Sequence, residues 1–257
     1  MPRFFLSSQK IIPNEILTLS GRETKHLQVL RLKKGEKVTL SNGKGDEFLA
    51  EIIKITSQES LLYIERKREF TIPKKPFFIL AQSIPRFSKM ELILQKGTEL
   101  GIDCIYPIAS QRSYISHGHL NYHRWERWKR ILQEAGKQSG RSLIPELKKP
   151  LLLRDFLLKE SKDLFKESLH VKLFLWEAEK SQSIRAMLTS VHKRPAAVSV
   201  LVGPEGGFSD DEALLAETAG YHCVSLGPWI MRTETASIAI LSILQYEWGD
   251  INFNNNH

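Results

Sequence analysis

The chain has 257 residues, a length typical of one large or two unequal domains and too long for a peptide. Its 42% of hydrophobic residues can build a core, but no uncharged apolar run approaches the roughly 18 residues that a membrane span needs. The two cysteines, Cys104 and Cys223, lie far apart without the spacing of metal ligands. We therefore expect a soluble cytoplasmic protein with no membrane segment.

The positive charge is concentrated in two separated segments. The net charge is +8, and residues 1–75 hold 15 Lys and Arg against 9 Asp and Glu, while residues 111–149 hold 9 against 3. Each segment carries +6, so the remainder is slightly acidic. This distribution is typical of a protein that binds a polyanion, most often nucleic acid. Charge that only maintains solubility is the alternative, and the charge alone leaves both open.

Short strands separated by turn residues are predicted for the N-terminal part. Residues 37–41 and 47–55 read as strands joined by Asn42-Gly43-Lys44-Gly45, a strong hairpin signal. A further strand at 60–65 is followed by Pro73-Lys74-Lys75-Pro76, which propagates neither helix nor sheet well. We predict a small β-barrel or sandwich over residues 1–72 and a domain boundary before residue 73.

Strands alternate with helices from Phe77 onward. An apolar strand at 77–81 precedes a helix that a capping box at Ser88–Glu91 would open and Gly101 would close. This alternation is typical of a parallel sheet covered by helices on both faces. The remaining strands are expected at 102–108, 171–176, 197–202 and 222–226, and the remaining helices at 122–139, 183–190, 209–219 and 237–244.

The loops that follow two of these strands are the predicted ligand site. Ligands of such sheets bind outside the carboxyl ends of the strands, which points to the loops after Val202 and Leu226. The last helix, 237–244, is apolar nearly all round, so it must be buried in a core or against a partner subunit.

Several enzyme classes lose support because their motifs are missing. The sequence contains no G-x-G-x-x-G, G-x-x-x-x-G-K-[ST], G-x-S-x-G or H-E-x-x-H, the motifs of dinucleotide enzymes, P-loop NTPases, α/β-hydrolases and zinc proteases. His117, His119 and His123 lie close together, but in a polar loop with no cysteine nearby. We interpret them as a solvated loop and expect no metal site.

The strongest local signal is the turn Gly203-Pro204-Glu205-Gly206-Gly207 after strand 197–202. Its glycines would let a ligand approach the backbone, although a plain tight turn would use them as well. Ser209 and Glu212 form a capping box that opens the next helix and need no catalytic role. Glu205 is not explained by helix initiation; it binds a ligand, faces solvent or accepts backbone hydrogen bonds.

The second signal is the loop from Leu226 to Ala236, which leads into the last helix. Thr233 or Thr235 can cap that helix, and Glu234 in its first turn suits the positive helix end. Arg232 fits this position poorly, because a cation at a helix N-terminus is unfavourable unless it binds something anionic. Arg232 is therefore a candidate for binding an anion.

The motifs together resemble the bacterial small-subunit rRNA (uracil-N3)-methyltransferases, members of the SPOUT superfamily of knotted methyltransferases. The resemblance covers nearly the whole chain. Trp229 stands where an Arg is common in the family, and Met231 where a Leu is common. The residues that carry it are Arg3-Phe4-Phe5, Val29-Leu30-Arg31, Gln95 to Gly101, Gln138 to Arg141, Pro145-Glu146, Gly203 to Phe208 and Arg232 to Ala236.

The resemblance implies a fold, a cofactor and a partner. A PUA-like domain over 1–72 would precede a SPOUT domain over 73–257, whose C-terminal segment passes through a trefoil knot. The family acts as a homodimer on a uridine near the 3′ end of 16S rRNA, in the decoding region of the assembled small ribosomal subunit. The residues implied to bind S-adenosylmethionine are Gly203, Pro204, Glu205, Gly206, Gly207, Leu226, Gly227, Ile230, Met231, Thr235 and Ala236.

The reaction requires orientation and removal of the proton on N3 of uracil. Glu205 and Glu234 are the carboxylates on matched motifs, and the sequence does not decide which is the base. Arg141 and Arg232 can stabilise negative charge that develops on the uracil oxygens.

The helix at 122–139 offers a basic face for RNA. Its apolar stripe contains Trp125 and Trp128, which we assign to the core rather than to base stacking. The predicted RNA contacts are Arg3, Arg31, Arg127, Arg130, Lys137 and Arg141.

Two other functions remain open at this point. A non-catalytic RNA-binding ribosome-assembly factor would share the basic segments but would not need a cofactor at the glycine turn. A small-molecule transferase would use the same loops but would not need the N-terminal charge excess.

Overall fold

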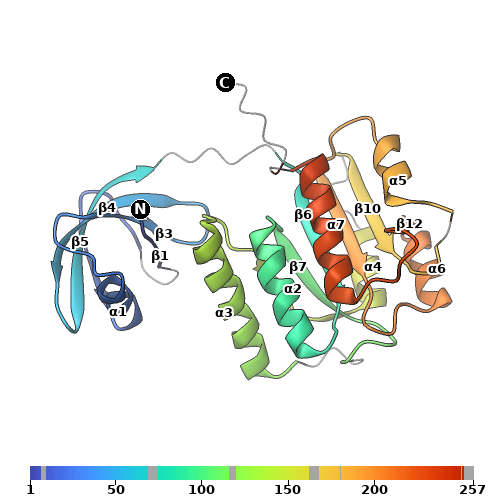
Figure 1. Cartoon of the computed structure of the whole chain (residues 1–257), viewed down its shortest axis with the longest axis horizontal. Helices are drawn as coiled ribbons and strands as arrows, with labels where there is room; N and C mark the ends of the chain where they lie inside the picture. Colours follow the sequence, from blue (N-terminus) through green and yellow to red (C-terminus); the bar gives the residue numbers. More distant parts are fainter. Residues whose placement is uncertain are drawn as a thin grey trace. The chain divides into compact units, whose positions relative to one another are not determined.

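The chain forms two compact units in the computed structural model, which describes residues 1–6, 10–68, 75–115, 120–161, 168–179, 181–249 and 251 (Figure 1). The first unit comprises Met1–Ile72 with Gln133–Ile144, and the second Pro73–Leu132 with Pro145–His257. The boundary expected before residue 73 falls outside the described residues and stays a prediction, and His117 and His119 lie outside them as well. The predicted domains, 1–72 and 73–257, did not include Gln133–Ile144 in the first unit.

The first unit is a five-stranded sheet in the order β1-β3-β4-β5-β2. Strands β3 and β4 have the predicted bounds and pair antiparallel across the turn at Asn42, and only β1 and β3 are parallel. Phe4, Leu40 and Leu62 are fully buried in its core. The elements are β1 (Arg3–Phe5), β2 (Ile16–Ser20), α1 (Arg22–Val29), β3 (Lys37–Ser41), β4 (Glu47–Ile55) and β5 (Glu59–Arg68).

Helix α1 was missed because its sequence carries few local signals. It begins after Gly21 at φ 62° and has no side-chain cap. Leu27 alone in the helix joins the core cluster, where it is fully buried. The two apolar residues among the eight, Leu27 and Val29, are two positions apart and give no helical period, so tertiary packing stabilises this helix.

Residues 140–144 return to the first unit and bind its β3–β4 hairpin. The N–H of Ile144 donates to the Gly43 carbonyl at 3.1 Å, and the N–H of Gly45 donates to the Ser142 carbonyl at 3.1 Å. The Arg3 guanidinium donates to the Gly140 carbonyl. The hairpin turn is therefore held by a segment far away in the sequence.

The second unit contains the predicted parallel sheet, in the order β12-β10-β11-β6-β7-β8, with β9 also paired to β7. Its central strand β11 is buried at every position, as expected where helices cover both faces. The strands are β6 (Phe77–Ser83), β7 (Cys104–Ala109), β8 (Glu146–Leu147), β9 (Leu151–Leu152), β10 (His170–Leu175), β11 (Ala197–Val202) and β12 (His222–Val224).

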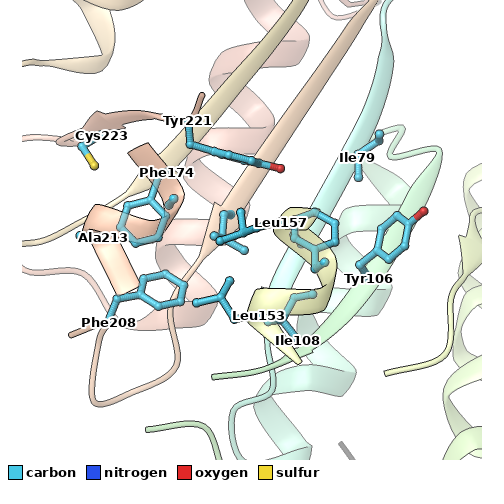
Figure 2. Close-up of a cluster of buried hydrophobic side chains, with 14 of the residues drawn as sticks. Ile79, Tyr106, Ile108, Leu153, Leu157, Phe174, Phe208, Ala213, Tyr221 and Cys223 are labelled. Atoms are coloured by element: carbon cyan, nitrogen blue, oxygen red, sulfur yellow. The ribbon is translucent and has the colours of Figure 1, made fainter. Parts of the chain in front are cut away.

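Helices pack on both faces of this sheet. On one face, side chains of α4 and α6 join Tyr106, Phe174 and Phe208 in a buried cluster (Figure 2). On the other face, α2 and α7 lie side by side, and a Cβ on Gly97 of α2 would lie 3.6 Å from Leu241 of α7. The helices are α2 (Phe87–Glu99), α3 (Tyr122–Ser139), α4 (Leu153–Ser161), α5 (Ile184–Ser190), α6 (Asp210–Thr218) and α7 (Thr233–Glu247).

The two predicted capping boxes have different outcomes. At α6 the box is confirmed, because Ser209 Oγ accepts from the Glu212 N–H and the Glu212 carboxylate accepts from the Ser209 N–H. At α2 it is wrong: the helix begins at Phe87, Arg86 is the N-cap residue, and no side chain caps it. The polypeptide already turns into the helix after Pro85, so Ser88 lies inside the first turn.

Helix α7 starts four residues before the predicted start. Arg232 is its N-cap residue, so neither Thr233 nor Thr235 caps it. Ile240 and Leu244 are fully buried, whereas Tyr246 is 60% exposed. The helix therefore packs into the core on one side, and among the described residues its other side is partly exposed. None of the helices in the described residues is long and apolar enough to cross a membrane.

Candidate cofactor cavity and charged cluster

A cavity of about 280 Å³ lies in the second unit, at the carboxyl ends of β10, β11 and β12. Both loops singled out from the sequence, after Val202 and after Leu226, form part of its walls. That a ligand binds there stays a prediction. The first residues of α7 and one residue of α2 complete the lining. The lining residues are Lys89, Leu175, Trp176, Glu177, Val202, Gly203, Pro204, Glu205, Val224, Ser225, Leu226, Gly227, Pro228, Trp229, Ile230, Met231, Arg232, Thr233 and Ala236.

Most of the expected cofactor residues line this cavity, but three do not. Gly206 faces Arg112, whose guanidinium donates to the Gly206 carbonyl at 2.9 Å. Gly207 lies against Glu177, and Thr235 is exposed on α7. Gly206 thus contacts Arg112, whereas we expected it to contact the cofactor. The expected residues in the lining are Gly203, Pro204, Glu205, Leu226, Gly227, Ile230, Met231 and Ala236.

Gly207 has a backbone conformation that favours glycine and lies against one wall of the cavity. Its φ is +64°, and an added Cβ would collide with the Glu177 carboxylate. Glu177 is the second residue after β10, and it forms part of the cavity lining. A carboxylate in this wall favours a cationic group of a ligand.

Other residues of the lining were not predicted from the sequence, among them Lys89, Trp176 and Glu177. The rule that ligands bind at strand ends would have found Trp176 and Glu177, because they follow strand β10. Lys89 gave no such signal, since its motif resembled a capping box.

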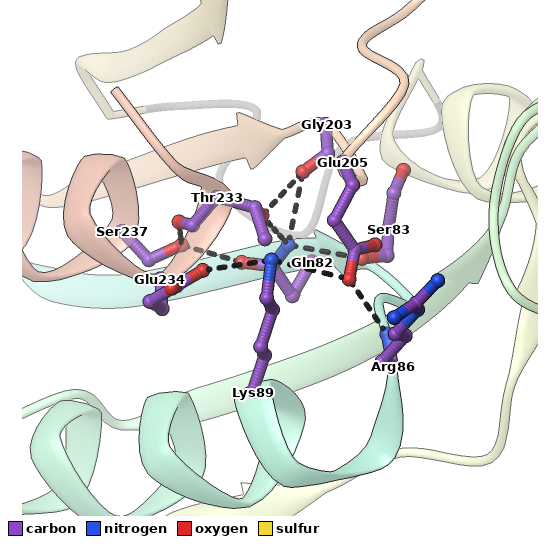
Figure 3. Close-up of polar contacts among 9 residues, drawn as sticks. All are labelled: Gln82, Ser83, Arg86, Lys89, Gly203, Glu205, Thr233, Glu234 and Ser237. Atoms are coloured by element: carbon purple, nitrogen blue, oxygen red, sulfur yellow. Dashed lines mark hydrogen bonds and ion pairs between the residues drawn. The ribbon is translucent and has the colours of Figure 1, made fainter.

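A buried glutamine ties the glycine turn to the start of α7. Gln82 is fully buried at the end of β6 and donates to the Gly203 carbonyl at 3.3 Å and to Thr233 Oγ1 at 3.0 Å (Figure 3). Thr233 Oγ1 donates to the same carbonyl at 2.5 Å, and Ser237 Oγ donates to Gln82 Oε1 at 2.6 Å. The three chain segments around the cavity are therefore fixed by one polar network.

Lys89 lies between two carboxylates at the edge of the cavity. Its Nζ is 3.4 Å from Glu205 Oε1 and 3.5 Å from Glu234 Oε2 (Figure 3). Glu205 Oε1 also accepts the backbone N–H of Arg86 at 3.1 Å. Burial raises the pKa of Glu205, but backbone hydrogen bonds and Lys89 outweigh burial, so this pKa lies below its ordinary value. Glu205 thus accepts a backbone hydrogen bond and also faces the cavity.

Arg232 is exposed at the N-terminus of α7 and lines the same cavity. Within the residues that the structure describes, its side chain has no hydrogen bond or ion pair. Glu234, the nearest acidic residue in the sequence, pairs with Lys89 instead. A cation in this position is unfavourable for the helix, so it remains available for an anionic partner.

The predicted RNA contacts on α3 are partly engaged within the protein. Arg127 donates to both oxygens of Glu91, at 2.5 and 2.7 Å, and these bonds hold the pKa of Glu91 below its ordinary range. Lys137 Nζ lies 3.3 Å from Glu23 Oε1, whereas Arg130 is exposed. If Arg127 and Lys137 contact RNA, each does so from a side chain that is already paired with a carboxylate of the protein.

The other predicted contacts lie in the first unit. Arg3 pairs with Glu47 at 3.1 Å. Arg31 is exposed, and its backbone has a positive φ of 55°. The backbone N–H of Arg141 donates to Gly136 at 3.0 Å, and Arg141 is not part of the cavity lining. The roles of these residues in RNA binding, and of Arg141 in catalysis, stay predictions.

The sequence matches two families, the RNA methyltransferase domain over residues 73–245 and the RNA methyltransferase PUA domain over residues 19–62. It is 31% identical over 229 residues to ribosomal RNA small subunit methyltransferase E of Aquifex aeolicus, covering 89% of this chain and 93% of that one. It is 32% identical to the Bacillus subtilis enzyme of the same name, covering 96% and 97%. The chain belongs to this RNA methyltransferase family.

Solved structures agree with this membership. The ribosomal RNA small subunit methyltransferase E of Neisseria gonorrhoeae, bound to S-adenosylmethionine, superimposes with a TM-score of 0.84 at 30% identity, covering 98% of this chain and 99% of that one. A Legionella pneumophila methyltransferase in complex with the same cofactor superimposes with a TM-score of 0.79 at 34% identity, covering 95% of this chain and 96% of that one. The predicted fold class, a methyltransferase sheet preceded by a PUA-like domain, is confirmed; the trefoil knot stays a prediction.

Metal ligation has no support in the residues that the structure describes. No group of three or more His, Cys, Asp or Glu side chains among them lies close enough to hold an ion.

Proposed function

We propose that this RNA methyltransferase transfers a methyl group from S-adenosylmethionine to N3 of a uridine near the 3′ end of 16S rRNA, in the decoding region of the cytoplasmic small ribosomal subunit. The observation that carries the proposal is the cavity at three strand ends, which is lined by the carboxylates of Glu177 and Glu205, by Lys89 and by Arg232, a side chain without a partner among the described residues. A non-catalytic assembly factor would not need such an opening.

The lining of the cavity suits this cofactor. S-adenosylmethionine supplies an electrophilic methyl group on a sulfonium, and it also carries an ammonium and an apolar adenine. Leu175, Val202 and Ile230 provide apolar wall for the adenine, and Glu177 provides negative charge for a cation. These residues of the chain are the ones that we expect to hold the cofactor.

The residues facing the cavity can perform the proton transfer. Glu205 lines the cavity with 31% of its side chain exposed, so it can reach the N3 proton of a bound uracil. The guanidinium of Arg232 can donate to a uracil oxygen as negative charge develops there. The N3 lone pair then forms the new bond to carbon while the bond from carbon to sulfur breaks, and Glu205 later releases the proton to water.

Two features support the proposed partners. The exposed side of α7, with Tyr246, supports a homodimer, which light scattering of the purified protein tests directly.

The two basic segments support binding to phosphates of 16S rRNA. Because such contacts release counterions, affinity for the small subunit should fall steeply with salt concentration, and a flat salt titration would contradict this binding mode.

The decisive experiment is nucleoside mass spectrometry of small-subunit rRNA from cells with and without this protein. We expect 3-methyluridine to be lost without it and restored when purified protein and S-adenosylmethionine are added to subunits from the deficient cells. Calorimetry with S-adenosylmethionine separates the alternative: an assembly factor would bind the subunit but not the cofactor. Unchanged 3-methyluridine would refute the proposal.

A further inference from the structure

Lys89 occupies a position that the fold alone does not favour. It lies in the first turn of α2, which has no side-chain cap, and a cation there opposes the helix dipole. The side chain nevertheless reaches the cavity and is only 26% exposed. Something other than helix formation must stabilise it there.

The stabilising partners come from two different loops. Glu205 belongs to the turn after β11 and Glu234 to the first turn of α7, and both carboxylates lie within 3.5 Å of the same nitrogen. Glu234 is 14% exposed and does not line the cavity, whereas Glu205 is more exposed and does. The three groups thus form a chain from the inner Glu234 through Lys89 to Glu205 at the cavity.

We propose that Lys89 is the positioning residue of the methyl transfer: anchored by Glu234, its ammonium holds Glu205 in the orientation in which Glu205 accepts the N3 proton. The inference rests on the proposed function and deepens it, because it selects one of two candidate bases. The logic is that of other enzymes in which a third group orients the group that takes the proton.

The charge around Glu205 gives this role a measurable consequence. A cation beside a carboxylate favours its ionised form, whereas nearby carboxylates favour the protonated form. Replacing Lys89 by a neutral residue removes the cation and leaves the Glu234 carboxylate nearby, so the pKa of Glu205 must rise. The charged groups that face Glu205 or adjoin its loop are Lys89, Arg86, Glu234, Glu177, Arg232 and Arg112.

The test compares Lys89→Gln with Lys89→Arg and with the control Lys96→Gln in the full-length protein. Lys96 pairs with Glu99 at 2.8 Å on the same helix, outside the cavity lining. We expect Lys89→Gln to lower kcat on the order of a hundredfold, and Lys89→Arg, which keeps the cation, to restore most of the rate. The dissociation constant of S-adenosylmethionine should stay within roughly threefold, since Lys89 acts on the base.

Two pH measurements separate positioning from a purely structural role. The rate requires ionised Glu205, so the acidic limb of the kcat profile should move to higher pH in Lys89→Gln and not in Lys96→Gln. In the ligand-free protein, carbon NMR of the Glu205 carboxyl should show the same upward shift of its pKa.

Specific outcomes would overturn the inference. If Lys89→Gln lost cofactor affinity in proportion to its rate, Lys89 would be a cofactor-binding residue. If both the acidic limb of the kcat profile and the pKa of the Glu205 carboxyl stayed unchanged in this variant, Lys89 would have no link to Glu205. Failure of the proposed function is distinguishable, because then the unmodified protein itself produces no 3-methyluridine.

Discussion

The two loops that form the cavity are held in contrasting ways. The turn at 203–208 is bonded from several directions: Gln82 and Thr233 donate to the Gly203 carbonyl, and Arg112 donates to the Gly206 carbonyl. The backbone of Ser225 pairs with the 182–184 segment, but beyond it the loop at 226–232 is bonded locally, between Ser225 and Gly227. This loop exposes Trp229 by 81% and Ile230 by 87%. One wall is therefore fixed by the fold, and the other is left for a ligand or partner to complete.

The largest effect is expected where the fixed loop is anchored. Gln82→Ala removes the buried hydrogen bonds that join Gln82 to the Gly203 carbonyl, to Thr233 Oγ1 and to Ser237 Oγ. Unfolding in urea should show a loss of about 2–4 kcal/mol, since each of these three bonds contributes about 0.5–1.5 kcal/mol. The exposed Gln111→Ala should stay within about 0.5 kcal/mol. A loss below about 1 kcal/mol for Gln82→Ala would show that the turn is held by other contacts.

Arg232, at the end of the open loop, should matter for rate and not for folding. Arg232→Ala should lower turnover on the order of a hundredfold, because a donor aimed at developing charge is lost. Its melting temperature should hold or rise, since the cation opposes the α7 dipole. Arg185→Ala is the matched control, because Arg185 is an exposed cation in the first turn of α5, outside the cavity lining. Full activity of Arg232→Ala would remove Arg232 from the catalytic group.

Gly207 tests how tightly the fixed loop is matched to its neighbour. Gly207→Ala should weaken S-adenosylmethionine binding about tenfold, or about 1.4 kcal/mol, because the new Cβ displaces Glu177. Gly220→Ala is the control: Gly220 also has a positive φ, of +83°, but open space around it. Both variants should lose about 1–3 kcal/mol of stability through backbone strain, and calorimetry should find weaker binding only in the first. Equal affinity in the two variants would place Glu177 away from the cofactor.

The smallest effect on stability is expected at the tip of the open loop. Trp229→Ala removes a side chain that packs against little of its own chain, so the free energy of unfolding should change by less than about 0.5 kcal/mol. Thermal unfolding of the purified protein measures this. If the variant loses more than about 1 kcal/mol at low and high protein concentration alike, the loop is packed within the chain and the contrast between the walls fails.

Local patterns predicted the parts of the fold that depend on neighbours in sequence. The strands predicted on either side of Asn42-Gly43 have the same bounds as β3 and β4. The capping box of Ser209 and Glu212 correctly predicted the start of α6. The same capping pattern failed at Ser88, because the direction in which the chain leaves β6 decides where α2 begins. Local signals are therefore necessary for such predictions but not sufficient.

The candidate site depends on contacts that spacing cannot reveal. Glu205 and Arg232 could be selected because each is unexplained by its own turn or helix. The bonds of Gln82 to Gly203 and Thr233 span 121 and 151 residues, and the ion pairs of Lys89 join three separate segments. These residues became visible only when the strand ends were brought together.

The interleaved composition of the first unit affects how it folds during synthesis. Its hairpin is completed by Gln133–Ile144, which leaves the ribosome well after Ile72. At about 5–20 residues per second, the sheet waits roughly 4 to 14 s for the segment that binds its turn. During that interval the amide of Gly45 and the carbonyl of Gly43 lack their native partners. A nascent chain halted before residue 133 should thus be cleaved by protease at this hairpin, whereas one halted well beyond residue 144 should resist.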